Sequence, residues 1–265
     1  AVRAQIDTQT GTAARPNGLS GGIAVDTNGD GVADVVYIGD LAGNMWKFDL
    51  SSSTPSAWNV AFSGAPLFST GGQPITTRPD VTRFTQGGYL VVFGTGRYID
   101  TQDNASTQAQ TFYGIRDQGA PVSGLSSLVK QNVVATAVGT DSNTYRLSTH
   151  AVGPPTLDAA LSGDDTTSVA TYNSARSGWY LNLPTSGERS VTDPAIRAGR
   201  VVFNTLIPNT DPCGFGCPGW GLEFDVMPGN RYRQPKFPTK RASPTPLGTL
   251  GRHNHPHANP HRPPT

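Results

Sequence analysis

Residues 21–50 read GGIAVDTNGDGVADVVYIGDLAGNMWKFDL, and their residue pattern indicates the fold class. It holds three short apolar runs, at 21–25, 34–39 and 43–50, each bounded by glycine, aspartate or asparagine. Runs of this length that are rich in β-branched and aromatic residues and separated by turn residues are typical of β-strands. We therefore expect three short strands here, the first two joined by the acidic segment DTNGDGVAD.

The same strand pattern returns along most of the chain. Further strands are expected at residues 88–99, 111–117, 178–183, 188–194, 199–208 and 219–230. The chain has 31 glycines and 22 prolines, only 15% of its 265 residues are charged, and no segment combines helical spacing of apolar residues with helix caps. No segment has the roughly 18 continuous apolar residues of a membrane span. The sequence predicts an all-β protein without membrane insertion.

Two strand segments end alike. GNMWKFDL at 43–50 and GWGLEFDV at 219–226 both place Phe and Asp at the end of a strand, and FYGIRD at 112–117 is a weaker echo. Recurring endings of this kind among many short strands favour the blades of a β-propeller. Because the spacing is irregular, a β-sandwich stays open from periodicity alone. The expected fold is a modified β-propeller of short antiparallel strands.

The strand pattern stops near Tyr232 and divides the chain into an expected propeller domain, 1–231, and a tail, 232–265. The tail holds eight prolines, four of the five histidines and no acidic residue. It has too little apolar surface to offset its ordering entropy, so we expect a disordered basic tail. Its segment HNHPHANPH could bind a transition metal, although a flexible end is the simpler interpretation.

The distribution of charge along the chain limits the classes of partner that can be expected. All 19 acidic residues but only 13 of the 20 Lys and Arg lie in residues 1–225. A body with this net negative charge lacks the clustered basic face that nucleic acids need, so no nucleic-acid partner is expected. The sequence opens in mid-pattern, and we expect it to be a piece of a longer chain.

The only two cysteines, Cys213 and Cys217, lie in the turn-rich segment DPCGFGCPG. A metal site would need more ligands, and a redox site would need a CxxC motif at a helix start. A local disulfide in an exported protein is expected first, and two free thiols are the alternative.

The segment DTNGDGVAD has the donor pattern of a calcium loop, since calcium takes six to eight oxygen ligands. The expected ligands are Asp26, Asn28, Asp30, the backbone carbonyl of Val32, and Asp34. Gly31 permits the sharp turn. Position twelve is Tyr37 and not the bidentate Glu of a helix-loop-helix site, so we expect a calcium loop between two strands. The alternatives are a metal-free turn rich in Asp, Asn and Gly, and a magnesium site, which octahedral geometry makes less suitable.

The stretch DTNGDGVADVVYIGDLAGNMWKFDL resembles the C-terminal β-propeller domain of the PilY family, the type IV pilus biogenesis and tip adhesin proteins of Gram-negative bacteria. Further segments follow the order of that family: PITTRPDV, VVFGTGRYI, TFYGIRD, GWYLNLPTSGERSVTDP and RVVFNTLIPNTDPCGFG. The resemblance covers residues 19–230.

The resemblance implies a non-enzymatic domain whose calcium binding and release control pilus extension against retraction, and with it twitching motility and surface attachment. It places the calcium ligands on Asp26, Asn28, Asp30, the Val32 carbonyl and Asp34. It also implies export to the pilus tip, cell surface or outer membrane, with pilins and pilus assembly proteins as partners. Host or surface ligands are expected through the N-terminal region of the family, which this sequence lacks.

Other functions stay open. A propeller dehydrogenase with pyrroloquinoline quinone would need a catalytic Asp and usually a vicinal disulfide, whereas the two cysteines here are separated by three residues. A glycan-binding or host-binding module could use Trp46, Trp58, Trp179 and Trp220, although aromatic residues within strands are more often core. The segment GTGRY at 94–98 lacks the Lys and helix of a phosphate loop, so a turn at a strand end is expected.

Overall fold

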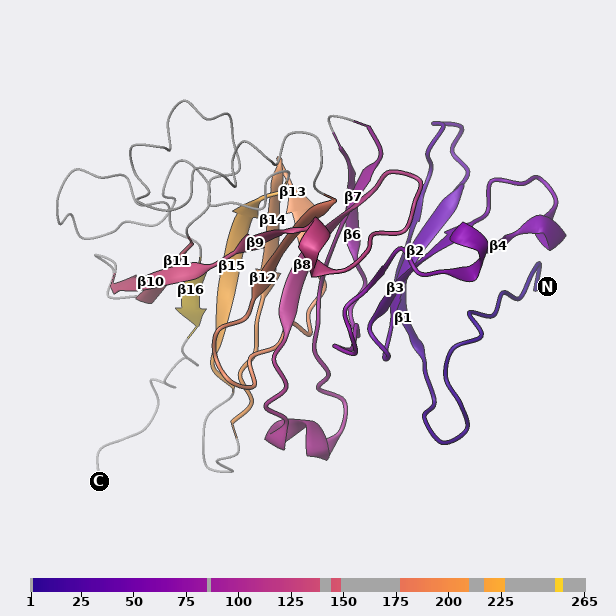
Figure 1. Ribbon diagram of the computed structural model, residues 1–265. Helices are drawn as coiled ribbons and strands as arrows, with labels where there is room; N and C mark the ends of the chain where they lie inside the picture. The colour runs from indigo at the N-terminus through magenta and orange to yellow at the C-terminus, as the bar shows by residue number, and fades with distance from the viewer. Residues whose placement is uncertain are drawn as a thin grey trace, which may run out of the picture.

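The computed structural model of the protein describes residues 2–84, 87–138, 144–148, 177–209, 217–226 and 251–254 (Figure 1). In these ranges the regular structure is β-strand apart from four short 3-10 helices, and α-helix is absent. The all-β prediction is confirmed. None of the described helices has the length and apolar character needed to cross a bilayer.

The first sheet is built from the N-terminal third of the chain. Its strands are β1 (Leu19–Val25), β2 (Val35–Asp40), β3 (Asn44–Asp49), β4 (Asn59–Val60) and β5 (Phe68–Ser69). The order is β1-β2-β3-β4, with β5 beside β3, and all pairs are antiparallel. The three strands expected around the acidic segment are therefore present, and that segment forms the β1–β2 loop.

The second sheet follows along the chain. Its strands, in spatial order, are β6 (Asp80–Arg83), β7 (Tyr89–Gly94), β8 (Thr111–Asp117), β12 (Gly178–Asn182) and β9 (Val129–Gln131). Only the β12–β9 pair is parallel. Strand β7 ends at Gly94, so GTGRY begins at a strand end and continues as a turn, as expected.

The third sheet has six strands. In spatial order they are β10 (Val133–Val138), β11 (Thr144–Ser148), β16 (Gly251–Asn254), β15 (Gly219–Asp225), β14 (Arg200–Asn204) and β13 (Ala195–Arg197). Strand β16 lies in the segment that was expected to be disordered, and it pairs with both β11 and β15. Without β16, strands β11 and β15 would each have an edge with unpaired backbone groups. Pairing with both edges explains why these four tail residues form a strand. The other tail residues lie outside the described ranges.

One expected strand is absent. Residues 188–194 form a single bridge, between Arg189 and Leu206, and no strand. The reason is that the charged side chains here turn inward: Glu188 and Arg189 are both buried, 0% and 3% exposed, and bind partners from other segments.

The three sheets stand side by side like the blades of a propeller (Figure 1). Strand β6 of the second sheet contacts β1 of the first and β13 of the third, so these strands lie at the inner edges of their blades. Within the described residues the sheets do not close into a ring.

The hydrophobic cores lie between the sheets. Side chains alternate along β7: Leu90 and Val92 join the core shared with the third sheet, whereas Val91 and Phe93 join the core shared with the first. Successive residues of a strand point to opposite faces, so the middle sheet is apolar on both sides. In the core shared with the third sheet the rings of Phe112 and Phe203 stack with centroids 3.6 Å apart.

A buried ion pair joins β11 of the third blade to the β12–β13 connection, which comes from the second blade. Arg146 donates to Glu188 Oε1 at 2.6 Å and Oε2 at 2.9 Å, and its guanidinium lies 4.0 Å from the ring centre of Trp220. The two side chains are 4% and 0% exposed. Thr205 also donates to Glu188 at 2.7 Å, so the carboxylate is well satisfied.

We expect Glu188→Ala to lower the free energy of unfolding by about 3–5 kcal/mol, because it leaves the Arg146 charge buried and unpaired. Chemical denaturation measures this. The matched control is Arg78→Ala, which removes the solvent-exposed pair with Asp193 and should cost about 1 kcal/mol or less. Equal losses in both variants would contradict a structural role for the buried pair.

Candidate functional site

The acidic loop 26–34 is anchored at both ends. The last residue pair of the β1–β2 ladder is Val25 with Val35, and Asp34 N–H donates to the Val25 carbonyl at 3.0 Å. Leu50 N–H donates to the Asp34 carbonyl at 2.7 Å. The loop is therefore a compact excursion from two paired strands, with its last residue also tied to the end of β3.

Asp26 organises the first half of the loop. Its Oδ1 accepts from Asn28 N–H at 3.1 Å and Gly29 N–H at 2.6 Å, and its Oδ2 accepts from Gly31 N–H at 2.8 Å. Both glycines have φ of +87°, a conformation that glycine adopts without strain. The backbone hydrogen bonds, first from Gly31 and then from Gly29, lower the pKa of Asp26 below its ordinary value.

Two further turns of the same kind follow. Asn28 Oδ1 accepts from Asp30 N–H at 2.8 Å, and Asp30 Oδ1 accepts from Val32 N–H at 2.8 Å. Side-chain oxygens that accept from a backbone N–H two residues on are the usual turn chemistry of Asp and Asn. Val32 is 64% exposed, so it takes part in the loop through its backbone N–H and not through its side chain.

Asp34 is held by Thr27, a residue that the sequence analysis did not single out. Asp34 Oδ2 accepts from the Thr27 hydroxyl at 2.6 Å and from Thr27 N–H at 2.7 Å, and Oδ1 accepts from Asn28 Nδ2 at 3.3 Å. The Thr27 hydroxyl and then the Thr27 N–H lower the pKa of Asp34, while the nearby Asp26 charge acts in the opposite direction. The side chains of Asp26 and Asp34 thus interact across the loop.

The loop also reaches the second sheet. Arg83, at the end of β6, donates from Nη2 to the Thr27 carbonyl at 2.9 Å. No local pattern could have identified this contact, because the two residues are separated by 56 positions. Thr27 therefore joins the Asp34 carboxylate on one side to the neighbouring blade on the other.

The loop donors match calcium in chemical kind, since they are hard oxygens on alternate residues. In the present geometry the Asp26 and Asp34 carboxylates, Asn28 Oδ1 and Asp30 Oδ1 accept hydrogen bonds from groups of the loop itself. Among the described residues no group of three or more His, Cys, Asp and Glu side chains is close enough to hold a metal ion. A bound calcium ion would require Asp26, Asp30 and Asp34 to turn toward a common centre.

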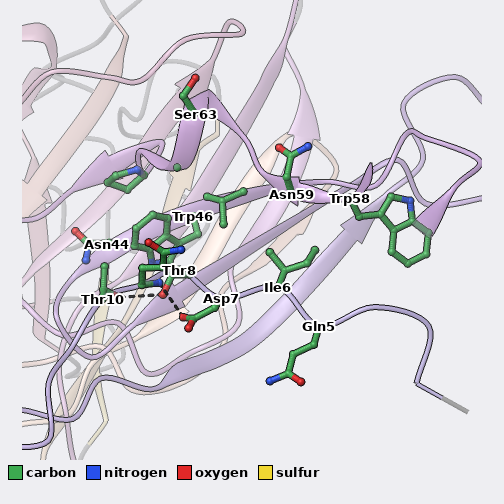
Figure 2. Close-up of a pocket in the computed structure, with 14 residues that line it drawn as sticks. Gln5, Ile6, Asp7, Thr8, Thr10, Asn44, Trp46, Trp58, Asn59 and Ser63 are labelled. Atoms are coloured by element: carbon green, nitrogen blue, oxygen red, sulfur yellow. Dashed lines mark hydrogen bonds between the residues drawn. The ribbon is translucent and has the colours of Figure 1, made fainter. Parts of the chain in front are cut away.

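A separate pocket of about 870 Å³ lies between the N-terminal segment, residues 5–10, and the first sheet (Figure 2). Trp46 and Trp58 line it. Trp46 is only 2% exposed and donates to Asp40 Oδ2 at 2.8 Å, and Trp58 is half-buried and donates to the Ser52 carbonyl at 2.8 Å.

The tryptophans are mainly core residues. Trp46, Trp179 and Trp220 are 2%, 0% and 7% exposed, so three of the four residues considered for glycan binding do not present an open ring. Trp179 lies in the core between the second and third sheets.

The cysteine prediction falls partly outside the described residues. Cys217 carries a free thiol, with its Sγ 3.7 Å from the Tyr98 hydroxyl. Cys213 lies in the range 210–216, which the structure does not describe.

Comparison with known proteins identifies the relatives of this chain. Residues 1–149 match the family model described as the PilY1 beta-propeller domain. The type IV pilus biogenesis factor PilY1 of Pseudomonas aeruginosa is 34% identical over 253 residues, which cover 84% of this chain and 21% of that protein. A PilY1 homolog of Xylella fastidiosa is 35% identical over 230 residues, covering 80% of this chain and 14% of that protein.

The fold agrees. The crystal structure of the Pseudomonas aeruginosa PilY1 C-terminal domain superposes with a TM-score of 0.73 at 27% identity, covering 92% of this chain and 57% of that chain. This confirms the modified β-propeller. The chain spans about a fifth or less of the curated relatives named here. On these matches, the chain belongs to the PilY1 β-propeller family.

Proposed function

We propose that this chain is a calcium-dependent, non-enzymatic propeller domain of a type IV pilus biogenesis factor, and that calcium binding and release control pilus extension against retraction. The observation that carries the proposal is the 26–34 loop: its acidic side chains are concentrated in one turn, and its hydrogen bonds reach two blades. The relatives are type IV pilus biogenesis factors, which supports the pilus setting.

The proposed calcium ligands are Asp26, Asn28, Asp30, the Val32 carbonyl and Asp34. A divalent cation offsets the repulsion among three carboxylates on one short loop, and it supplies a fixed coordination centre in place of the turn hydrogen bonds. An ordinary Asp carboxyl is ionised at neutral pH, and the pKa values of Asp26 and Asp34 are lowered further, so both groups can attract a cation.

Thr27 couples the proposed calcium site to the contact between the first and second blades. When Asp34 turns toward calcium, its hydrogen bonds with the Thr27 hydroxyl and N–H must change. Thr27 also accepts from Arg83 of the second blade, so the ion state biases the contact between the two blades. A ligand that interacts differently with two arrangements shifts their populations. Pilins and pilus assembly proteins at the cell surface are the proposed partners that read this difference.

Calorimetry with calcium is expected to show one binding event per chain, which Asp34→Ala and Asp30→Ala both abolish because each removes an oxygen ligand. Asp30→Ala is the gentler change, since the Asp30 side chain is exposed and holds one N–H, that of Val32. The control is Asp7→Ala, an exposed carboxylate outside the loop. Undiminished calcium binding by either loop variant would refute the ligand assignment.

The same variants test control of the pilus. In the full-length protein, expressed in a bacterium that depends on it for pili, Asp34→Ala and Asp30→Ala should change the ratio of extended to retracted pili and abolish its response to calcium. Surface pili counted by microscopy and twitching zones on agar measure this. If the variants lose calcium binding in vitro but cells that carry them have a normal ratio of extended to retracted pili, the calcium site is supported and the control function is rejected.

The pH dependence follows from the lowered pKa values of Asp26 and Asp34. The hydrogen bonds to these carboxylates contribute stability at pH values above 3.8, the pKa of the unfolded state. This contribution is lost as the pH falls through the lower pKa values of the folded state.

Thr27→Val removes the hydroxyl that lowers the pKa of Asp34 most. We therefore expect the midpoint of the Asp34 carboxyl, measured by NMR titration, to be higher in this variant. An unchanged midpoint would show that the Thr27 hydroxyl does not act on Asp34.

A further inference from the structure

A second pocket, of about 370 Å³, lies where loops of the first and second blades meet the connection from the second blade to the third. Leu41 comes from the β2–β3 turn of the first blade and Pro74 from the β5–β6 connection to the second. Arg97 and Gln110 come from the β7–β8 connection, and Arg189 from the β12–β13 connection. Gly96 N–H donates to the Pro74 carbonyl at 2.8 Å and Ser190 N–H donates to the Thr95 carbonyl at 3.0 Å, so the loops are joined by backbone contacts. Junctions of this kind are common locations of ligand sites.

The pocket carries an excess of positive charge. Arg97 Nε donates to Asp103 Oδ1 at 2.8 Å, and Asp103 Oδ2 accepts from the N–H groups of Ile99 and Asp100, both at 2.9 Å. Both oxygens of this carboxylate are thus engaged. Arg189 is 3% exposed and donates to backbone carbonyls. These are the carbonyls of Gly187, Arg97, Asp103 and Ser106. The pocket is thus lined by two guanidinium groups and one carboxylate, and only Arg97 pairs with that carboxylate.

Arg97 offers free hydrogen-bond donors. Its Nε is used by Asp103, but its two terminal nitrogens donate to no acceptor in the described part of the chain. The side chain is 42% exposed and lines the pocket. A planar guanidinium edge with parallel N–H groups matches a carboxylate, to which it donates two hydrogen bonds.

Gln110 offers the opposite group, an unpaired acceptor. Gln108 Nε2 donates to the Gly72 carbonyl at 3.1 Å, and Gln108 Oε1 accepts from Gln110 Nε2 at 3.2 Å. These two hydrogen bonds fix the orientation of both side-chain amides, and Gln110 Oε1 takes part in neither. Gln110 is 4% exposed, and within the described residues its Oε1 accepts no hydrogen bond. A buried acceptor of this kind is satisfied by a ligand that donates, such as one with hydroxyl groups.

We propose that this pocket binds a hydroxylated carboxylate of the hexuronate class, with its carboxylate on Arg97 and a hydroxyl group that donates to Gln110 Oε1. The pocket volume suits one sugar ring. A neutral sugar lacks the group that Arg97 binds, and a simple carboxylate such as acetate lacks the donor that Gln110 needs. The hexuronate can be a free monosaccharide or the end unit of an acidic polysaccharide. The site is separate from the 26–34 loop.

The first test is calorimetry on the whole 265-residue chain with a chelator present, so that calcium cannot link uronates to the acidic loop. The probes are glucuronate, galacturonate, a galacturonate trimer, glucose and acetate. We expect the uronates to bind more tightly than glucose and acetate. A trimer that binds more tightly than the monomers indicates the end of a polysaccharide, and equal affinities indicate the monosaccharide. Glucose or acetate bound as tightly as glucuronate, or no uronate bound, would overturn the proposal.

The second test locates the site. Arg97→Lys, which keeps the charge but loses the guanidinium fork, and Gln110→Met, which removes the acceptor, should each weaken glucuronate binding by about tenfold or more. Arg15→Lys is the matched control, because Arg15 is exposed and lies in the N-terminal segment away from the pocket. If Gln110→Met lowers the melting temperature, the exposed Arg97→Lys variant decides. Unchanged affinity in Arg97→Lys would overturn the assignment.

Discussion

Apolar side chains pack on both faces of the middle sheet, and this packing joins the three sheets into one fold. Alternate residues of β7 enter two different cores, so the second blade can be stable only when a blade lies on each side of it. The packing of the Trp179 indole also requires a glycine at position 114. Gly114 lies opposite Trp179 in the β8–β12 pair, and a Cβ atom at position 114 would come within 2.5 Å of the indole ring.

Buried polar contacts fix the relative positions of the blades. Asp117 of the second blade accepts from the Tyr37 hydroxyl and from Lys47 Nζ of the first, both at 2.6 Å. Burial and the nearby Asp117 carboxylate raise the pKa of Tyr37, so it stays a neutral donor. Apolar packing alone allows neighbouring sheets to slide, whereas a buried carboxylate must keep its donors. Rigid blades of this kind leave the loops at their ends free to carry chemistry.

Both proposed sites are such loops, but they differ in how far the sequence reveals them. The acidic loop is contiguous, so its ligand types, spacing and place between two strands could be predicted from residues 26–34. Its supporting residues could not: Thr27 looks like an ordinary turn residue, and Arg83 belongs to another blade. The Arg97 and Gln110 pocket left no signal, because GTGRY reads as a turn and its other walls come from distant segments.

The strands with the clearest apolar runs, among them β2, β3, β7 and β8, could be predicted from the sequence, because alternation of apolar residues and the position of turn residues are local properties of the chain. Strands β6, β9, β10, β11 and β13 were not predicted. The sequence also determined the type of donor in the acidic loop. It was wrong where long-range partners override a local pattern, as at residues 188–194, where burial of Glu188 and Arg189 replaces a strand. Which faces meet and which charges are paired became known from the folded structure alone, since contacts such as Arg146 with Glu188 depend on how the sheets and their connections pack and not on any spacing along the chain.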